Sequence, residues 1–162
     1  MNEAPRISAA YAAAETGILV YAKKERIVTE LNVAANIQTD MLPKVPPFPW
    51  RADDIFASMP SAKEAGGDFY DFFLIDDGHM RALVSDASGK GVPAALFAVI
   101  AKALIDENMK LKRSPELCFE LVNNALFENN DSAMFVNSFM GVPEMSTGKF
   151  TYVNAGRNPP FM

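Results

Sequence analysis

The chain has 162 residues, of which 49% are hydrophobic and 22% are charged, and its formal net charge is −5. These values are typical of a soluble globular domain and exclude a disordered or fibrous chain. The negative charge argues against nucleic acid and anionic membranes as partners, because both attract basic surfaces. No apolar run reaches the roughly 18 residues of a membrane span. Because the single cysteine, Cys118, fits a reducing compartment, we expect a cytoplasmic protein without a membrane span.

A long helix is expected from about Thr16 to Leu42, where good helix formers run without proline. Its apolar side chains recur at three- and four-residue spacing, at Ile27, Leu31, Ala34, Ala35 and Met41. The narrow stripe and its charged flanks favour a regulatory linker that pairs with a second copy, or equally a surface helix packed on its own domain. Four prolines in "LPKVPPFPW" then end it. We expect a linker helix in residues 1–43 and a second domain in residues 44–162.

Three strands are expected after the prolines, in "DIFASM", "DFYDFFLI" and "MRALVSD", because aromatic and β-branched residues dominate them. The run Asp76-Asp77-Gly78-His79 separates the last two as a hairpin turn does. Residues 68–75 and 80–86 should therefore pair as antiparallel strands, with His79 solvated in the turn.

Two helices and two strands should complete the chain. The first helix opens near Pro93, with an apolar face at Leu96, Phe97, Ile100 and Leu104. The second is capped by Ser114 and starts at Pro115, with an inner side at Leu117, Leu121, Val122 and Ala125. The strands are "AMFVNSFMGV" and "KFTYVNAG", joined across Ser146-Thr147-Gly148.

This order of elements predicts an α+β fold with an antiparallel sheet rather than alternating strand and helix units. The nearly continuous apolar run from Met134 to Val142 predicts a strand buried on both faces. We therefore expect a β-sandwich flanked by helices.

Glycines flank carboxylates in "EAGGDFYD" and "SDASGKG", which lie on either side of the hairpin. If the hairpin forms, Asp68 at one strand's start and Asp86 at the other's end lie at the same end of the ribbon. Two close carboxylates repel unless a cation lies between them or one binds a proton. Mg²⁺ or Mn²⁺ suits such oxygens, and a zinc site is excluded by the single histidine and single cysteine.

Other readings of these glycine stretches are weaker. A phosphate-binding P-loop needs Gly where Val84 stands and Ser or Thr where Gly91 stands. The Gly-Gly-Asp run is shared with the hairpin of diguanylate cyclases, but Phe69 follows Asp68 where that hairpin needs an acid. A purely structural role stays open for each, since glycine next to aspartate is common in turns.

Five blocks, in this order, resemble the SpoIIE/RsbU branch of the metal-dependent PPM-type (protein phosphatase type 2C) serine/threonine phosphatases. They are "LNVAANIQTDMLP", "EAGGDFYDFF", "SDASGKGVPAALF", "AMFVNSFMGV" and "YVNAGRNPP", and the resemblance covers about Leu31 to Met162. It implies a β-sandwich flanked by helices and a binuclear Mn²⁺ or Mg²⁺ centre. It also implies that Asp68 and Asp86 are catalytic metal ligands, with Asp86 bridging the metals, and that the carbonyl of Ala87 is a further ligand.

The resemblance implies hydrolysis of phosphoserine or phosphothreonine on a protein, typically a phosphorylated anti-anti-sigma factor with a STAS domain in bacterial partner switching. An upstream sensor is expected to act through the N-terminal helix, with a homodimer through that helix as a further expectation. Arg157 stands where the family usually has histidine in "NAGHNPP". Further metal-binding aspartates of the family are expected beyond Met162, so we expect a C-terminally truncated domain of doubtful activity. The alternative is a non-catalytic module that binds a STAS partner.

Overall fold

The computed structural model describes residues 4–44, 56–59, 66–128 and 130–159. Its elements are α1 (Ala4–Asp40), β1 (Asp68–Asp76), β2 (His79–Ala87), α2 (Gly91–Lys110), α3 (Pro115–Phe127), β3 (Val136–Pro143) and β4 (Phe150–Ala155). The α+β class with an antiparallel sheet predicted from the sequence is confirmed.

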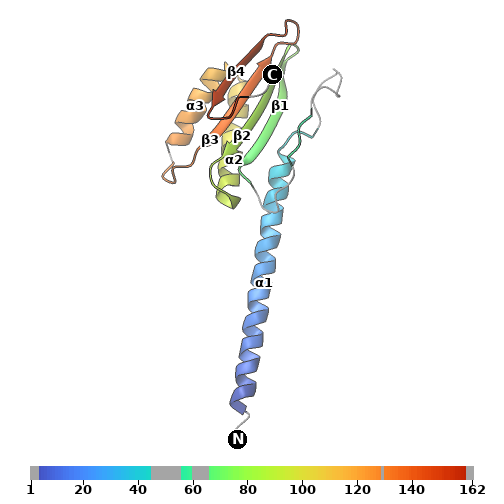
Figure 1. The fold of residues 1–162 in the computed structure, drawn as a ribbon, viewed down its shortest axis with the longest axis vertical. Helices are drawn as coiled ribbons and strands as arrows, with labels where there is room; N and C mark the ends of the chain where they lie inside the picture. The colour runs from blue at the N-terminus through green and yellow to red at the C-terminus, as the bar shows by residue number, and fades with distance from the viewer. Residues whose placement is uncertain (1–3, 45–55, 60–65, 129, 160–162) are drawn as a thin grey trace.

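The four strands form one antiparallel sheet in the order β1-β2-β3-β4, and helices α2 and α3 pack on one of its faces (Figure 1). The predicted hairpin is present, because β1 and β2 pair in register from Asp68 opposite Asp86 to Leu74 opposite Met80. The turn follows at Asp77-Gly78, where the Gly78 amide donates to the Asp76 carboxylate at 2.9 Å.

The other face of the sheet is aromatic. Phe139, Phe150 and Tyr152 stack there with ring centroids 5.7–6.5 Å apart, and Tyr152 is 56% exposed. The prediction that Met134 to Val142 is buried on both faces is therefore wrong: β3 buries Ser138 and Met140 against the helices, whereas Phe139 is only partly covered. Within the described residues, a single sheet is present.

The strand expected in "DIFASM" is also not formed. Residues 56–59 have no regular structure, and Phe56 is 90% exposed. They lack a strand partner among the described residues, so their high β propensity has no ladder to stabilise. Asp54 and Ile55 lie outside the described part of the chain.

The buried face of helix α2 overlaps the predicted one only in part. Its buried residues are Ala94, Ala95, Ala98, Ala101, Lys102, Ile105, Asn108 and Met109. Of the predicted residues, Leu96 and Ile100 are exposed, whereas Phe97 and Leu104 are partly buried against the core. Alanines allow the helix backbone to lie close to the sheet, and the long side chains of Lys102 and Ile105 fill the space that remains.

Helix α3 begins as predicted, with Pro115 at its start and the Ser114 hydroxyl accepting a hydrogen bond from the Leu117 amide at 3.3 Å. Its buried residues are Cys118 and Val122, whereas the predicted Leu117 and Ala125 are exposed. Burial raises the pKa of the Cys118 thiol to about 11, which keeps this cysteine an unreactive core residue.

Helix α1 starts earlier than predicted and projects away from the sheet (Figure 1). Its C-terminal part packs on the domain through a stripe at Leu31, Ala34, Ala35 and Gln38, which Leu42 continues just after the helix. Two residues of the predicted stripe, Ile27 and Met41, are exposed. None of the helices in the described ranges is long and apolar enough to cross a membrane.

Four charged side chains lie between the sheet and α2, three of them buried and the fourth, Asp106, partly buried. Arg81 of β2 contacts Asp71 of β1 and lies 2.7 Å from the Asp106 carboxylate of α2. Lys102 lies 3.2 Å from Asp71 and 2.7 Å from Asp106. The Arg81 guanidinium, which is fully buried, also lies 4.1 Å from the ring centroid of Phe73. These residues are called the buried charge cluster below; its two positive and two negative groups balance.

Candidate metal centre

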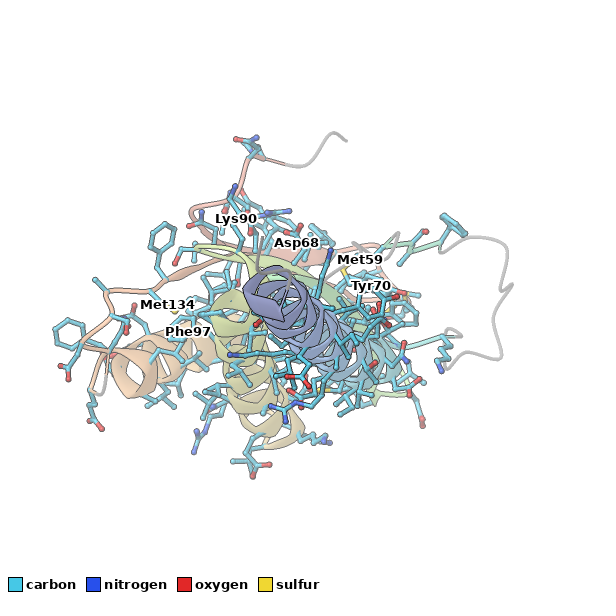
Figure 2. All side chains as sticks on the ribbon, turned by 90° about the horizontal axis from the view of Figure 1, so that it is seen from below. Met59, Asp68, Tyr70, Lys90, Phe97 and Met134 are labelled. Carbon is cyan, nitrogen blue, oxygen red and sulfur yellow. The ribbon has the colours of Figure 1, made fainter. Side chains whose placement is uncertain are left out.

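Asp68 and Asp86 lie directly opposite each other at one end of the hairpin. Directly opposed residues of antiparallel strands point to the same face of the sheet with Cα atoms about 4.5–5.5 Å apart. Figure 2 views this end from below, with Asp68 at the start of β1 and Lys90 just ahead of α2. The two carboxylates predicted as metal ligands are therefore brought together by the hairpin register.

The pKa of Asp68 is affected by the second carboxylate beside it. Partial burial and the neighbouring Asp86 carboxylate, which also takes part in a hydrogen bond with it, raise the pKa of Asp68. The positive charge of Arg157 acts in the opposite direction and partly offsets this increase. A positive charge at this position therefore stabilises the ionised pair.

Ala87 follows Asp86 and lies against the backbone before Asp68. Its amide donates to the Gly67 carbonyl at 3.0 Å, and its own carbonyl oxygen would lie only 2.5 Å from a Cβ atom at position 67. Only glycine allows this approach, so Gly67 keeps the Ala87 carbonyl at the same end of the hairpin as the two carboxylates.

Gly67→Ala is expected to lower the free energy of unfolding by about 1–3 kcal/mol, because the new Cβ must push the Ala87 backbone away. The change should also weaken Mn²⁺ binding. Gly66→Ala is the matched control, since no atom lies within 4 Å of its Cβ position. Thermal unfolding and Mn²⁺ titration of both variants check this; equal behaviour of the two would contradict the proposed role of Gly67.

The loop "SDASGKG" is shaped by two glycines with positive φ, +90° at Gly89 and +66° at Gly91. The Ser88 amide donates to the Phe135 carbonyl at 2.8 Å, and the Ser88 hydroxyl accepts from the Phe135 amide at 2.9 Å. Lys90 is exposed and its side chain makes no capping hydrogen bond to α2. The loop is thus tied to the chain entering β3 through Ser88, while Lys90 faces solvent.

Gln38 is a residue near the site that the sequence analysis did not single out. Its side-chain amide donates to the Gly66 carbonyl at 2.5 Å and its oxygen accepts from the Gly66 amide at 3.0 Å. Gly66 is two residues from Asp68, so α1 is attached directly to the backbone that positions this carboxylate. A signal was present: Gln38 is the one polar residue in the stripe of α1 that packs on the domain.

The donor set suits hard divalent cations, with two carboxylates and a main-chain carbonyl as oxygen ligands. No cluster of three or more His, Cys, Asp or Glu side chains able to hold a metal occurs among the described residues. A cavity of about 260 Å³ lies elsewhere, between α2, α3 and the β3 end, with Phe97 and Met134 in its lining (Figure 2). None of the described residues that line it carries a carboxylate, so the hairpin end is the stronger candidate.

Curated relatives were found for most of the chain. Phosphoserine phosphatase RsbU of Bacillus subtilis (strain 168) is 33% identical over 139 residues, which cover 85% of this chain and 41% of that protein. Protein IcfG of Synechocystis sp. is 30% identical, with 82% of this chain and 25% of that protein covered. The chain thus spans less than half the length of either relative.

Two solved structures share the fold. The SiaA-PP2C domain of Pseudomonas aeruginosa has a TM-score of 0.61 at 22% identity and covers 81% of this chain and 54% of that one. The RsbU and RsbW domains of Rv1364c from Mycobacterium tuberculosis have a TM-score of 0.52 at 24% identity and cover 57% of this chain and 25% of that one. The family model described as Stage II sporulation protein E (SpoIIE) matches residues 76–162. Because that match spans more than half of the length of this chain, the chain belongs to the SpoIIE family.

Proposed function

We propose that this chain contributes the Asp68–Asp86 end of the active site of a metal-dependent protein-serine/threonine phosphatase. The observation that carries the proposal is the direct opposition of these two carboxylates in the hairpin of a SpoIIE-family chain. Mn²⁺ or Mg²⁺ is the expected ion, because hard divalent cations prefer oxygen ligands.

Each residue has a defined part in this proposal. With metal bound, Asp86 would be the central carboxylate ligand, Asp68 would be a second ligand from the neighbouring strand, and the Ala87 carbonyl would add a neutral oxygen. When bound, the metals supply a water of lowered pKa as nucleophile and neutralise charge on the phosphoryl oxygens. The N-terminus of α2, which opens directly after the loop, favours a phosphoryl group through its free amides.

The proposed substrate is a phosphorylated STAS-domain anti-anti-sigma factor in the bacterial cytoplasm. Support comes from the identity to phosphoserine phosphatase RsbU. We further propose that residues 1–43 act as a linker that transmits the state of an upstream sensor, with a homodimer through α1. The bidentate contact between Gln38 and Gly66 supports this coupling, because a shift of α1 would pull on the backbone before Asp68.

A second candidate is a non-catalytic module that binds a STAS partner without hydrolysis. It is favoured by the ion pair between Arg157 and Asp86, because a guanidinium 3.5 Å from this carboxylate opposes the binding of a metal cation there. Metal dependence of phosphate release separates the two candidates.

The test is phosphate release from an aryl phosphate and from a phosphoserine STAS protein by the purified protein that carries this chain, with Mn²⁺ or with EDTA. Release that requires Mn²⁺ is expected. Release that persists in EDTA would contradict the metal-dependent mechanism, and binding of the STAS protein without release in Mn²⁺ would favour the non-catalytic module.

A further inference from the structure

Arg157 is held in place by a built turn after β4. The Arg157 amide donates to the Asn154 side-chain oxygen at 2.9 Å, and the Asn154 side-chain amide donates to the Arg157 carbonyl at 2.9 Å. Gly156 between them has φ +83°. One side chain thus fixes both backbone polar groups of Arg157.

This turn is packed against the strand beside the carboxylate pair. A Cβ atom at Gly156 would lie 2.4 Å from the side-chain oxygen of Asn137, which only glycine avoids. Asn137 is in turn the residue of β3 directly opposite Asp86. The backbone of the turn is therefore anchored one strand away from Asp86, independently of the arginine side chain.

From this anchor the guanidinium reaches the carboxylate pair. An Nη1 atom of Arg157 lies 3.5 Å from Oδ2 of Asp86, with 30% of the arginine side chain and 47% of the aspartate side chain exposed. The pair Asp68 and Asp86 carries up to two negative charges, so Arg157 neutralises at most one of them. Attraction for a divalent cation remains, but Asp86 already has a positively charged neighbour.

We propose that Arg157 is a tethered cation that holds Asp86 in the metal-free protein and competes with the divalent metal for it. The proposal rests on the proposed metal site and adds to it a residue that sets metal affinity. A metal that binds Asp86 must displace the guanidinium or tolerate its repulsion, and either effect weakens binding. The contact is partly exposed, so its effect is moderate and decreases as salt screens it.

Removing the charge should therefore strengthen metal binding. Arg157→Gln is expected to tighten Mn²⁺ binding by roughly fivefold, the factor that corresponds to the upper range for a partly exposed ion pair. Arg157→Lys keeps the charge and should bind Mn²⁺ within about twofold of the unmodified protein. The difference between Arg157→Gln and the unmodified protein should shrink at high salt.

The experiment is Mn²⁺ titration by calorimetry and by the electron paramagnetic resonance signal of free Mn²⁺, with no substrate present. Arg26→Gln, which removes a charge from an exposed ion pair on α1, is the matched control for net charge. The turn keeps its Asn154 hydrogen bonds in every Arg157 variant because these involve only the Arg157 backbone; a thermal unfolding curve verifies folding.

The outcomes separate the two proposals. Tighter binding in Arg157→Gln alone supports the tethered cation, and so does binding that appears only in this variant. Mn²⁺ binding of equal or lower affinity in Arg157→Gln overturns the tethered cation while leaving the metal site intact. Equal tightening in Arg26→Gln overturns it as well, since net charge alone would then set the affinity. If neither the unmodified protein nor any variant binds Mn²⁺, both the metal site and the competition of Arg157 with the metal for Asp86 are overturned.

Discussion

Asp86→Asn is expected to abolish Mn²⁺-dependent phosphate release and to weaken Mn²⁺ binding by about a hundredfold or more. Even groups that only orient metal ligands contribute factors of roughly 10 to 100 in affinity or activity, and Asp86 is proposed as a ligand itself. The large expected effect on Mn²⁺ binding follows from the central place of Asp86 on β2, between Asp68 on β1 and Asn137 on β3. Asparagine keeps the shape of the side chain but removes the charge. Calorimetric titration and phosphate release measure the two effects.

Asp77→Asn is the matched control for this prediction. Asp77 is exposed in the turn at the opposite end of the same hairpin, so the substitution removes the same charge far from the proposed site. Its affinity and rate should equal those of the unmodified protein. Full activity of Asp86→Asn would refute the site assignment, and an equal loss in Asp77→Asn would show that net charge, rather than the carboxylate pair, controls metal binding.

The carboxylate pair could be predicted from the sequence because it depends on local rules. The turn at Asp77-Gly78 pairs Asp76 with His79, and a register shift between Leu74 and Asp76 then brings Asp68 opposite Asp86. The cap at Ser114 and the start of α3 follow equally from neighbours in the sequence. These features need no knowledge of distant contacts.

The features that could not be predicted from the sequence depend on tertiary contacts. Leu96 and Ile100 are more hydrophobic than Ala98 and Ala101, yet the alanines face the sheet because close approach of the helix matters more than the size of each apolar side chain. The contact between Gln38 and Gly66 links residues 28 positions apart, so the sequence shows a polar residue within an apolar stripe but does not show its partner.

The burial of Arg81 also depends on tertiary contacts and could not be predicted from the sequence. In the sequence it is a single charge within a β-strand pattern, and a charged residue is almost never fully buried unless it is paired. Its partners Asp71 and Asp106 come from a neighbouring strand and from α2. Only the assembled layers reveal that this arginine lies in the core.

Arg81→Met is expected to lower the free energy of unfolding by about 3–5 kcal/mol, the range for removing one partner of a buried ion pair. Methionine has a similar length and fills much of the space, so the loss is mainly electrostatic. Asp71 and Asp106 would then share Lys102 as the remaining positive group of the buried charge cluster. Burial lowers the pKa of the Arg81 guanidinium, and the Asp106 carboxylate acts in the opposite direction. Urea unfolding followed by circular dichroism measures the change.

The same substitution at an exposed ion pair provides the comparison. Arg26 and Glu30 lie 3.3 Å apart on α1 with side chains 74% and 66% exposed, so Arg26→Met should change stability by less than about 1 kcal/mol.

Adding Asp106→Leu to Arg81→Met restores the charge balance and should recover part of the loss, because an apolar replacement of both partners avoids an unpaired buried charge. A cost for Arg81→Met no larger than for Arg26→Met would mean that the buried charge cluster is accessible to water. Failure of the double variant to recover stability would instead place the loss in packing around Phe73, which the guanidinium covers.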